Sequence, residues 1–229
     1  DFRVKARSSA KPLWDRLFFA GSMLASLSQG WMLGRYISGF GEGWNYPVFA
    51  GAIAVALPAA YALLGATWLV MKTEGALQLK AIGWAKLAWA PVVIGMVLIS
   101  LATPWISATV RERWFALPAI IALMVIPIAT GIALMTARVV LDKAIVRTTL
   151  CWLPFVALIA VFVLGFIGLA YSIYPFVVID RLTIWQAASS TPALKVILAG
   201  VCISVPAIAA YTVFSYRVFW GKATALRYA

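Results

Sequence analysis

The amino-acid sequence predicts an all-α protein that crosses a membrane several times. Hydrophobic residues make up 64% of its 229 residues, charged residues only 11%, and the mean hydropathy is +0.97. Soluble domains carry far more charge. The apolar residues form long stretches with the charges at their ends, and each stretch reaches the roughly 20 residues that a membrane-spanning helix needs. No stretch alternates polar with apolar residues, as the strands of a membrane barrel do.

Six stretches are predicted to be membrane-spanning helices of a single domain that covers residues 1–229. In chain order they are Leu17–Phe40, Pro47–Met71, Trp84–Ile106, Phe115–Ala137, Leu150–Tyr174 and Ala193–Phe219. Tryptophan residues stand near most of their ends, where an indole ring fits between acyl chains and headgroups.

The first span contains a pair of glycines four residues apart, Gly30 and Gly34. Small residues at this spacing let two helices approach closely, so we expect this face to pack on another helix. Gly21 and Ala25 are expected one step further along the same face.

Prolines interrupt four of the other spans. They are Pro58, Pro91, Pro127 and Pro206, in the second, third, fourth and sixth spans. Proline removes a backbone donor, so each of these helices is expected to bend, and neighbouring helices tolerate such bends inside a bundle.

Positive residues are divided unevenly between the two sides of the membrane that six crossings create. One side receives Arg3, Lys5, Arg7, Lys11, Arg16, Lys72, Lys80, Lys86, Arg138, Lys143, Arg147, Arg217, Lys222 and Arg227; the other receives Arg35, Arg111, Arg113, Arg181 and Lys195. Lysine and arginine accumulate on the cytoplasmic side, so both visible ends are predicted to be cytoplasmic. The net charge of +12 therefore indicates topology and contact with anionic lipid, not a nucleic-acid partner.

The chain begins with Asp1 and a basic run, without an initiator methionine or a signal-peptide core. We expect earlier helices to precede this segment in a longer protein.

The sequence contains no histidine and only seven acidic residues. Haem and non-haem metal sites normally use histidine, cysteine or clustered carboxylates. The six methionines all lie in apolar contexts and are expected to pack. We therefore expect no catalytic residue, no metal ligand and no redox centre held by this chain alone.

Two polar residues of the first span are candidate functional positions. Gln29 lies inside the span, where it could bind a ligand headgroup or form a hydrogen bond to a neighbouring helix. Arg35 lies nearer the end, where it is expected to extend to the surface and pair with Glu42.

Several short segments carry more information than composition does. They are Leu64–Gly75 (LGATWLVMKTEG), Tyr174–Phe176 (YPF) followed by Leu182–Ser190 (LTIWQAASS), and Tyr216–Lys222 (YRVFWGK), with Phe2–Ala6 (FRVKA), Trp14–Arg16 (WDR) and Gln29–Gly30 near the start. In this order and spacing, over essentially the whole chain, they resemble subunit II of cytochrome bd-type quinol oxidases.

The resemblance implies a haem-free subunit in a bacterial inner membrane, paired with a larger haem-bearing subunit I and, in some complexes, small accessory subunits. The complex would oxidise quinol and reduce dioxygen to water, and this chain would pack against subunit I, shield it from lipid and leave room for a bound quinone or lipid. Trp185 and Gln186 lie in one of the matching segments. Familiar members carry an acidic residue where Gln186 stands, and glutamine there resembles the cyanide-insensitive branch.

Lys72 and Glu74 follow the second span directly. They are expected to form a simple helix exit, with Lys72 reaching the surface and Glu74 paired with a nearby lysine. The alternative is that Glu74 gathers protons or docks a partner loop.

Two other classes of protein fit parts of the sequence. A small-solute transporter would also have bent helices and a few polar groups in the membrane, but such proteins often show paired internal repeats, and none is evident here. A purely structural membrane component without an enzyme partner is the third interpretation.

Overall fold

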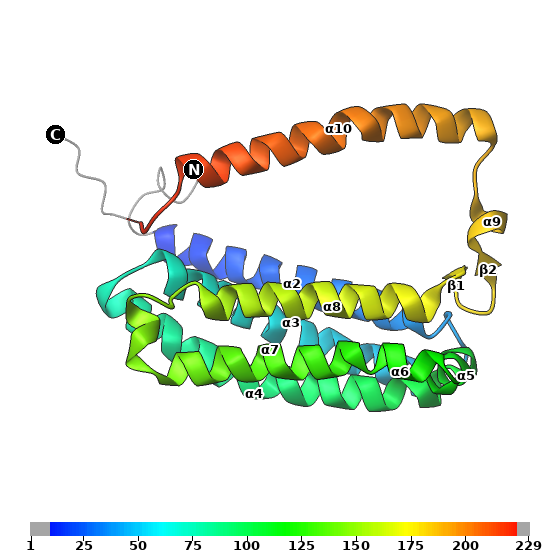
Figure 1. The fold of residues 1–229 in the computed structure, drawn as a ribbon, viewed down its shortest axis with the longest axis horizontal. Coiled ribbons are helices and arrows are strands. Elements are labelled where there is room, and N and C mark those ends of the chain that lie inside the picture. Colours follow the sequence, from blue (N-terminus) through cyan, green and yellow to red (C-terminus); the bar gives the residue numbers. More distant parts are fainter. Residues whose placement is uncertain (1–9, 224–229) are drawn as a thin grey trace.

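The computed structural model describes residues 10–223, apart from the side chains of Ala119 and Ala122. Within this range the protein is a bundle of long helices (Figure 1). The helices are α2 Lys11–Ile37, α3 Asn45–Lys72, α4 Gly75–Ile106, α5 Ala108–Phe115, α6 Ala119–Leu123, α7 Val125–Asp142, α8 Leu153–Ile173, α9 Ile184–Ala187 and α10 Thr191–Val218, with a 3-10 turn, η2, at Ala144–Arg147. A small antiparallel hairpin joins β1 Phe176–Val178 to β2 Leu182–Thr183. The predicted all-α class is confirmed.

Five of the described helices, α3, α4, α7, α8 and α10, are long and apolar enough to cross a membrane. The first predicted span forms α2, which has 27 residues but is not among these five. Glycine, serine and glutamine residues in its second half lower its hydropathy. Composition therefore supports five of the six predicted spans.

The prediction of a single helix over Phe115–Ala137 is wrong. The segment is divided among the end of α5, the short α6 and most of α7. Pro118 stands between α5 and α6, where it has no amide hydrogen to continue a helix. Pro127 lies in the first turn of α7, where a missing donor costs little, so it marks the start of this helix and does not bend its middle.

Other boundaries also differ from the predicted ones. α4 begins at Gly75, nine residues before Trp84, so that only Thr73 and Glu74 separate it from α3. α8 begins at Leu153 instead of Leu150. The expected prolines inside α3, α4 and α10 are present, and α4 contains a second one, Pro104.

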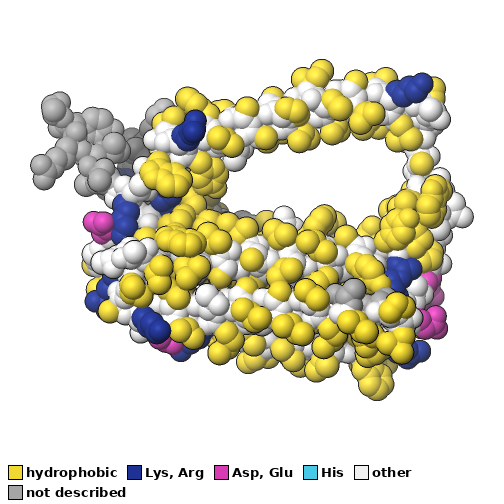
Figure 2. All heavy atoms as spheres, in the orientation of Figure 1, with side chains coloured by type: hydrophobic (Ala, Val, Ile, Leu, Met, Phe, Trp, Pro, Cys, Tyr) yellow, Lys and Arg dark blue, Asp and Glu magenta, His cyan; other side chains and the backbone are white. Residues whose placement is uncertain are grey.

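The core of the bundle lies between α3, α4, α7 and α8. Its largest cluster includes the fully buried side chains of Leu63 and Val70 on α3, Leu141 on α7 and Leu158 on α8. These helices are apolar on most sides, as expected where both core and lipid accept apolar groups. Hydrophobic side chains cover the middle of the molecule in Figure 2, while lysines and arginines lie near its ends.

α2 packs on α3 through its two glycines. A Cβ built at Gly30 would lie 2.6 Å from the Cα of Ala54, and one built at Gly34 would lie 2.4 Å from the Cα of Ala50. The predicted close helix contact is confirmed. Its predicted extension to Gly21 is wrong, because a Cβ at Gly21 would have nothing within 4 Å.

A buried amide ties the end of α3 to the turn after α7. The Gln78 side chain is 4% exposed, and its Nε2 donates to the carbonyl of Val70 at 3.0 Å and to that of Arg147 at 3.4 Å. Val70 lies in the last turn of α3, where carbonyls lack a partner within the helix. We expect Gln78→Leu to lower the free energy of unfolding by about 1 kcal/mol. Thermal unfolding of the purified protein in detergent would measure this, and an unchanged midpoint would contradict it.

Candidate functional site

One face of α3 carries several of the residues that the sequence marks as distinctive. Tyr61, Gly65, Trp68 and Lys72 follow one another at steps of four, three and four residues, so they share one face of the helix. The Trp68 ring meets the Tyr216 ring of α10 edge-on, with centroids 6.0 Å apart. This face of α3 therefore points toward α10.

The polar contact in the middle of this face joins α3 to α2. The Tyr61 hydroxyl donates to Oε1 of Gln29 at 2.9 Å. The Tyr61 ring also stacks on Phe162 of α8, with centroids 6.2 Å apart and planes inclined by 8°. The hydrogen bond between helices expected for Gln29 is confirmed, although its partner is a tyrosine and not a serine or the backbone. Sequence reasoning missed Tyr61. Tyr61 lies seven residues, or about two helical turns, before Trp68, and this spacing could have shown that the two residues share one face of the helix.

Lys72, at the end of the same face, binds the end of α10. Its ammonium donates to the carbonyls of Phe219 at 3.0 Å and Gly221 at 3.1 Å, and it lies 5.3 Å from the centroid of the Trp68 ring. In return, the amide of Ala223 donates to the Lys72 carbonyl at 2.7 Å. A cation at the carboxyl end of a helix also meets a favourable dipole.

A second lysine makes the reciprocal contact. Lys222 Nζ lies 3.4 Å from Oε1 of Glu74 and donates to the Thr73 carbonyl at 3.4 Å. The expected pairing of Glu74 with a lysine is confirmed, but this lysine is distant in sequence. We call Lys72, Thr73 and Glu74 together with 219–223 the C-terminal clasp. It brings together two of the segments that carry the family resemblance.

Arg35 lies at the opposite end of the bundle. Its guanidinium donates to the Gly41 carbonyl at 3.2 Å and lies 5.9 Å from the centroid of the Phe40 ring. The predicted pairing with Glu42 is wrong, since no ion pair joins these two residues. The loop after α2 turns back over the helix end, which brings a carbonyl within reach of Arg35 first. Arg35 therefore orders this loop.

Trp185 and Gln186 occupy the short α9 at the same end. Gln186 Oε1 accepts a hydrogen bond from the backbone amide of Thr183 at 2.9 Å, and the backbone amide of Gln186 donates to Thr183 Oγ1 at 3.4 Å. This is a capping box, in which either glutamate or glutamine can occupy the position of Gln186. Trp185 contacts Tyr174 edge-on at 6.4 Å between centroids. Both residues shape the connection into α10.

Sequence reasoning also missed a polar group at the junction of α4 and α7. Trp89 Nε1 donates to the carbonyl of Leu134 at 2.9 Å, and Arg138 lies 5.8 Å from its ring centroid. Asp142 binds both Lys86 at 2.8 Å and Arg138 at 3.3 Å. These contacts hold two helices together at the clasp end of the bundle.

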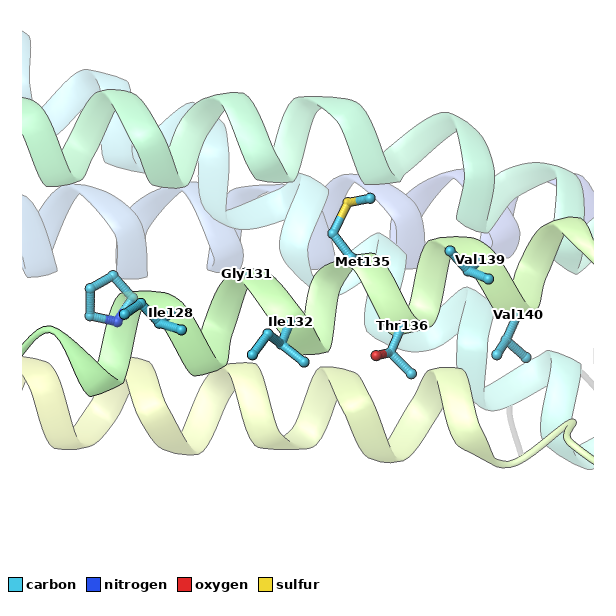
Figure 3. Close-up of a pocket in the computed structure, with 8 residues that line it drawn as sticks. Ile128, Gly131, Ile132, Met135, Thr136, Val139 and Val140 are labelled. Atoms are coloured by element: carbon cyan, nitrogen blue, oxygen red, sulfur yellow. The ribbon is translucent and has the colours of Figure 1, made fainter.

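A shallow hollow of about 580 Å³ lies on α7. All its lining residues belong to that one helix (Figure 3). Thr136 is the one lining residue with a polar side chain. An open, apolar surface of this kind suits lipid tails or another helix better than a polar substrate.

The chain's residues do not fit a haem or metal. The sequence has no histidine, and no three Cys, Asp or Glu side chains of the described residues are grouped so that they could hold a metal ion. Cys151, which precedes α8, is half-buried and Cys202 on α10 is exposed, and both are free. Within the described residues, the candidate residues form helix contacts, caps and the clasp between the ends of α3 and α10.

Comparison with known proteins gives the family. No curated protein matches the sequence. A family model described as cytochrome bd terminal oxidase subunit II matches residues 1–219. This match covers almost the whole chain and agrees with the membrane helices and the clasped motifs. The chain belongs to the family of cytochrome bd terminal oxidase subunit II.

Proposed function

We propose that this chain is the haem-free membrane subunit of a complex that oxidises quinol and reduces dioxygen to water. Family membership supports a place in a terminal oxidase. The observation that carries the haem-free role is the absence of histidine from all 229 residues. Histidine is the usual axial ligand of protein-bound haem, alone or together with methionine, so in this proposal the haems belong to the larger subunit I.

The contribution of this chain is structural. Its apolar surface packs against subunit I and shields that subunit from lipid, and small accessory subunits join the same assembly in this proposal. A quinone or lipid held in a groove of the complex is part of the proposal, with no residue of this chain assigned to it. The family match gives no support to the transporter alternative.

We also propose that the clasp end of the bundle faces the cytoplasm and that the protein lies in a bacterial inner membrane. Lys72, Lys86, Arg138, Arg217 and Lys222 all lie at or near that end. Positive residues accumulate on the cytoplasmic side of membrane proteins.

The test is a comparison of the chain purified with and without subunit I. We expect reduced-minus-oxidised spectra to show haem bands only when the larger subunit copurifies. Stoichiometric binding of iron porphyrin by this chain alone would overturn the haem-free role.

A substitution at Glu74 distinguishes a clasp that is only structural from one in which Glu74 takes up protons. Its side chain is 73% exposed, and exposed ion pairs contribute about 0–1 kcal/mol. We expect Glu74→Gln to leave assembly intact and quinol oxidase turnover within about twofold of the parent. Oxygen consumption by the purified complex measures this. A tenfold loss of turnover with normal assembly would instead support proton uptake through Glu74.

A further inference from the structure

The hollow on α7 is an apolar groove that follows the helix from Pro127 to Val140, and we call it the α7 groove. Ile132 is 64% exposed there, and a Cβ built at Gly131 would have nothing within 4 Å. Figure 3 shows the lining side chains along this one helix. Thirteen helical steps give the groove a length of about 20 Å. The hydrocarbon core of a membrane is about 30 Å thick, so the groove is long enough for the acyl chain of a lipid from one leaflet.

The connection from α7 to α8 carries two cations, Lys143 and Arg147, just beyond the Val140 end of the α7 groove. Lys143 follows the last turn of α7, and its amide donates to the Val140 carbonyl at 3.1 Å. Both cationic side chains are exposed, and neither forms an ion pair or a hydrogen bond within the part of the chain that the structure describes. Both charges are therefore available to a group from outside the chain.

The backbone that carries these cations is held in place. Val146 is 2% exposed, and Gln78 Nε2 donates to the Arg147 carbonyl at 3.4 Å. The exposed Trp152 lies at the start of α8, and indole rings favour the headgroup region of a membrane. Lys143 and Arg147 are therefore expected at headgroup depth, on a backbone that needs little further ordering to bind a ligand.

Acidic residues are scarce around this end of the groove. Asp142 is the one acidic residue of the sequence between Glu112 and Asp180. Its carboxylate already binds two cations, Lys86 at 2.8 Å and Arg138 at 3.3 Å. The positive charge of the α7–α8 connection is therefore not neutralised by this carboxylate.

An anionic phospholipid matches both parts of this surface. An acyl chain fits the apolar groove, and a phosphate at headgroup depth is attracted to lysine and arginine. A helix of another subunit matches less well. Membrane helices carry positive residues at their own cytoplasmic ends, so such a helix would bring like charges toward Lys143 and Arg147.

On the basis of the proposed function, in which the complex holds a lipid and this end faces the cytoplasm, we propose a specific lipid site. The α7 groove, with Lys143 and Arg147 at its end, binds one phospholipid with an anionic headgroup from the cytoplasmic leaflet.

The test uses the purified oxidase complex in nanodiscs of phosphatidylcholine. A trace of phosphatidylglycerol with a photoreactive diazirine on its acyl chain is added, so that the yield of adducts is proportional to affinity. Each cation near a membrane surface contributes about fivefold in affinity. We expect adducts between Pro127 and Val140, at a yield roughly twentyfold above that of phosphatidylcholine with the same diazirine chain.

A paired substitution tests the two cations. Lys143→Gln together with Arg147→Gln should lower the phosphatidylglycerol yield roughly twentyfold. Lys195→Gln together with Arg217→Gln removes one exposed lysine and one exposed arginine from α10 and should leave the yield unchanged. Chymotrypsin is used to map the adducts, because these variants remove trypsin sites.

A glycine substitution tests the groove itself. Gly131→Leu adds a side chain where a Cβ has open space, so it should fill the groove and lower the yields of both lipids at least fivefold without a steric conflict. Gly83→Leu is the matched control, because position 83 on α4 is equally open and lies outside the groove.

Equal yields from the two lipids, equal yields from the two paired substitutions, or the absence of any lipid adduct on α7 would overturn the lipid site. Haem spectra of the same nanodiscs separate this result from a failure of the proposed function. Normal haem bands together with any of these outcomes would remove the lipid site alone. Haem bound by the isolated chain would overturn the haem-free role and leave the labelling of α7 unaffected.

Discussion

Gly34→Leu is expected to disrupt the packing of α2 on α3 and to lower the amount of assembled oxidase complex severely. A Cβ at position 34 would lie 2.4 Å from the Cα and 2.9 Å from the Cβ of Ala50. The nearest of these atoms belongs to the backbone, so the conflict can be relieved only by moving one helix. Overpacking of this kind costs about 3 kcal/mol. Thermal unfolding and the yield of complex purified in detergent measure the loss.

Gly21→Leu is the matched control on the same helix. A Cβ at Gly21 would have nothing within 4 Å, and surface substitutions usually change stability by less than about 0.5 kcal/mol. The control separates steric conflict from the effect of adding an apolar side chain to α2. Equal losses from both variants would contradict the role assigned to Gly34.

The contact between α2 and α3 could be predicted from the sequence because it depends on local spacing. Glycines four residues apart lie on one helix face whatever surrounds them, and Gly30 and Gly34 do meet Ala54 and Ala50. Gly21 lies nine residues before Gly30, which is half a turn away from that face. The extension failed because helical geometry already excluded it.

The division of the fourth predicted span could have been anticipated only in part. Pro118 and Pro127 both signal a helix boundary or a bend, and composition does not say which. The structure places Pro118 between two helices and Pro127 in the first turn of α7. Hydropathy alone joins these pieces because apolar residues continue across the breaks.

The sequence identified several residues of the candidate site but did not predict which of them lie in contact. Lys72, Glu74 and Lys222 all lie in segments with a family resemblance, yet the contacts of the clasp join residues 147 to 149 positions apart. No periodicity connects such positions. The partner of Gln29 was missed for the same reason, because a tyrosine on another helix leaves no local pattern around the glutamine.

Lys72→Met is expected to release the end of α10 from the bundle. The variant keeps an unbranched apolar stem but loses the donors to Phe219 and Gly221 and the cation near the Trp68 ring. Hydrogen bonds from a charged group contribute about 1.5–3 kcal/mol each when buried, and these are partly exposed, so we expect a loss near 2 kcal/mol. That loss favours local opening roughly thirtyfold.

Limited trypsin digestion of the assembled complex measures this opening, because Arg217 and Lys222 flank the end of α10. We expect cleavage after these residues to accelerate about thirtyfold in Lys72→Met, in proportion to the open population. Lys80→Met removes an exposed lysine of α4 and should leave the rate unchanged. Lys72→Arg, which keeps a cation at the end of the stem, should recover part of the protection. Equal cleavage rates in Lys72→Met and Lys80→Met would show that α10 is held by something other than the clasp.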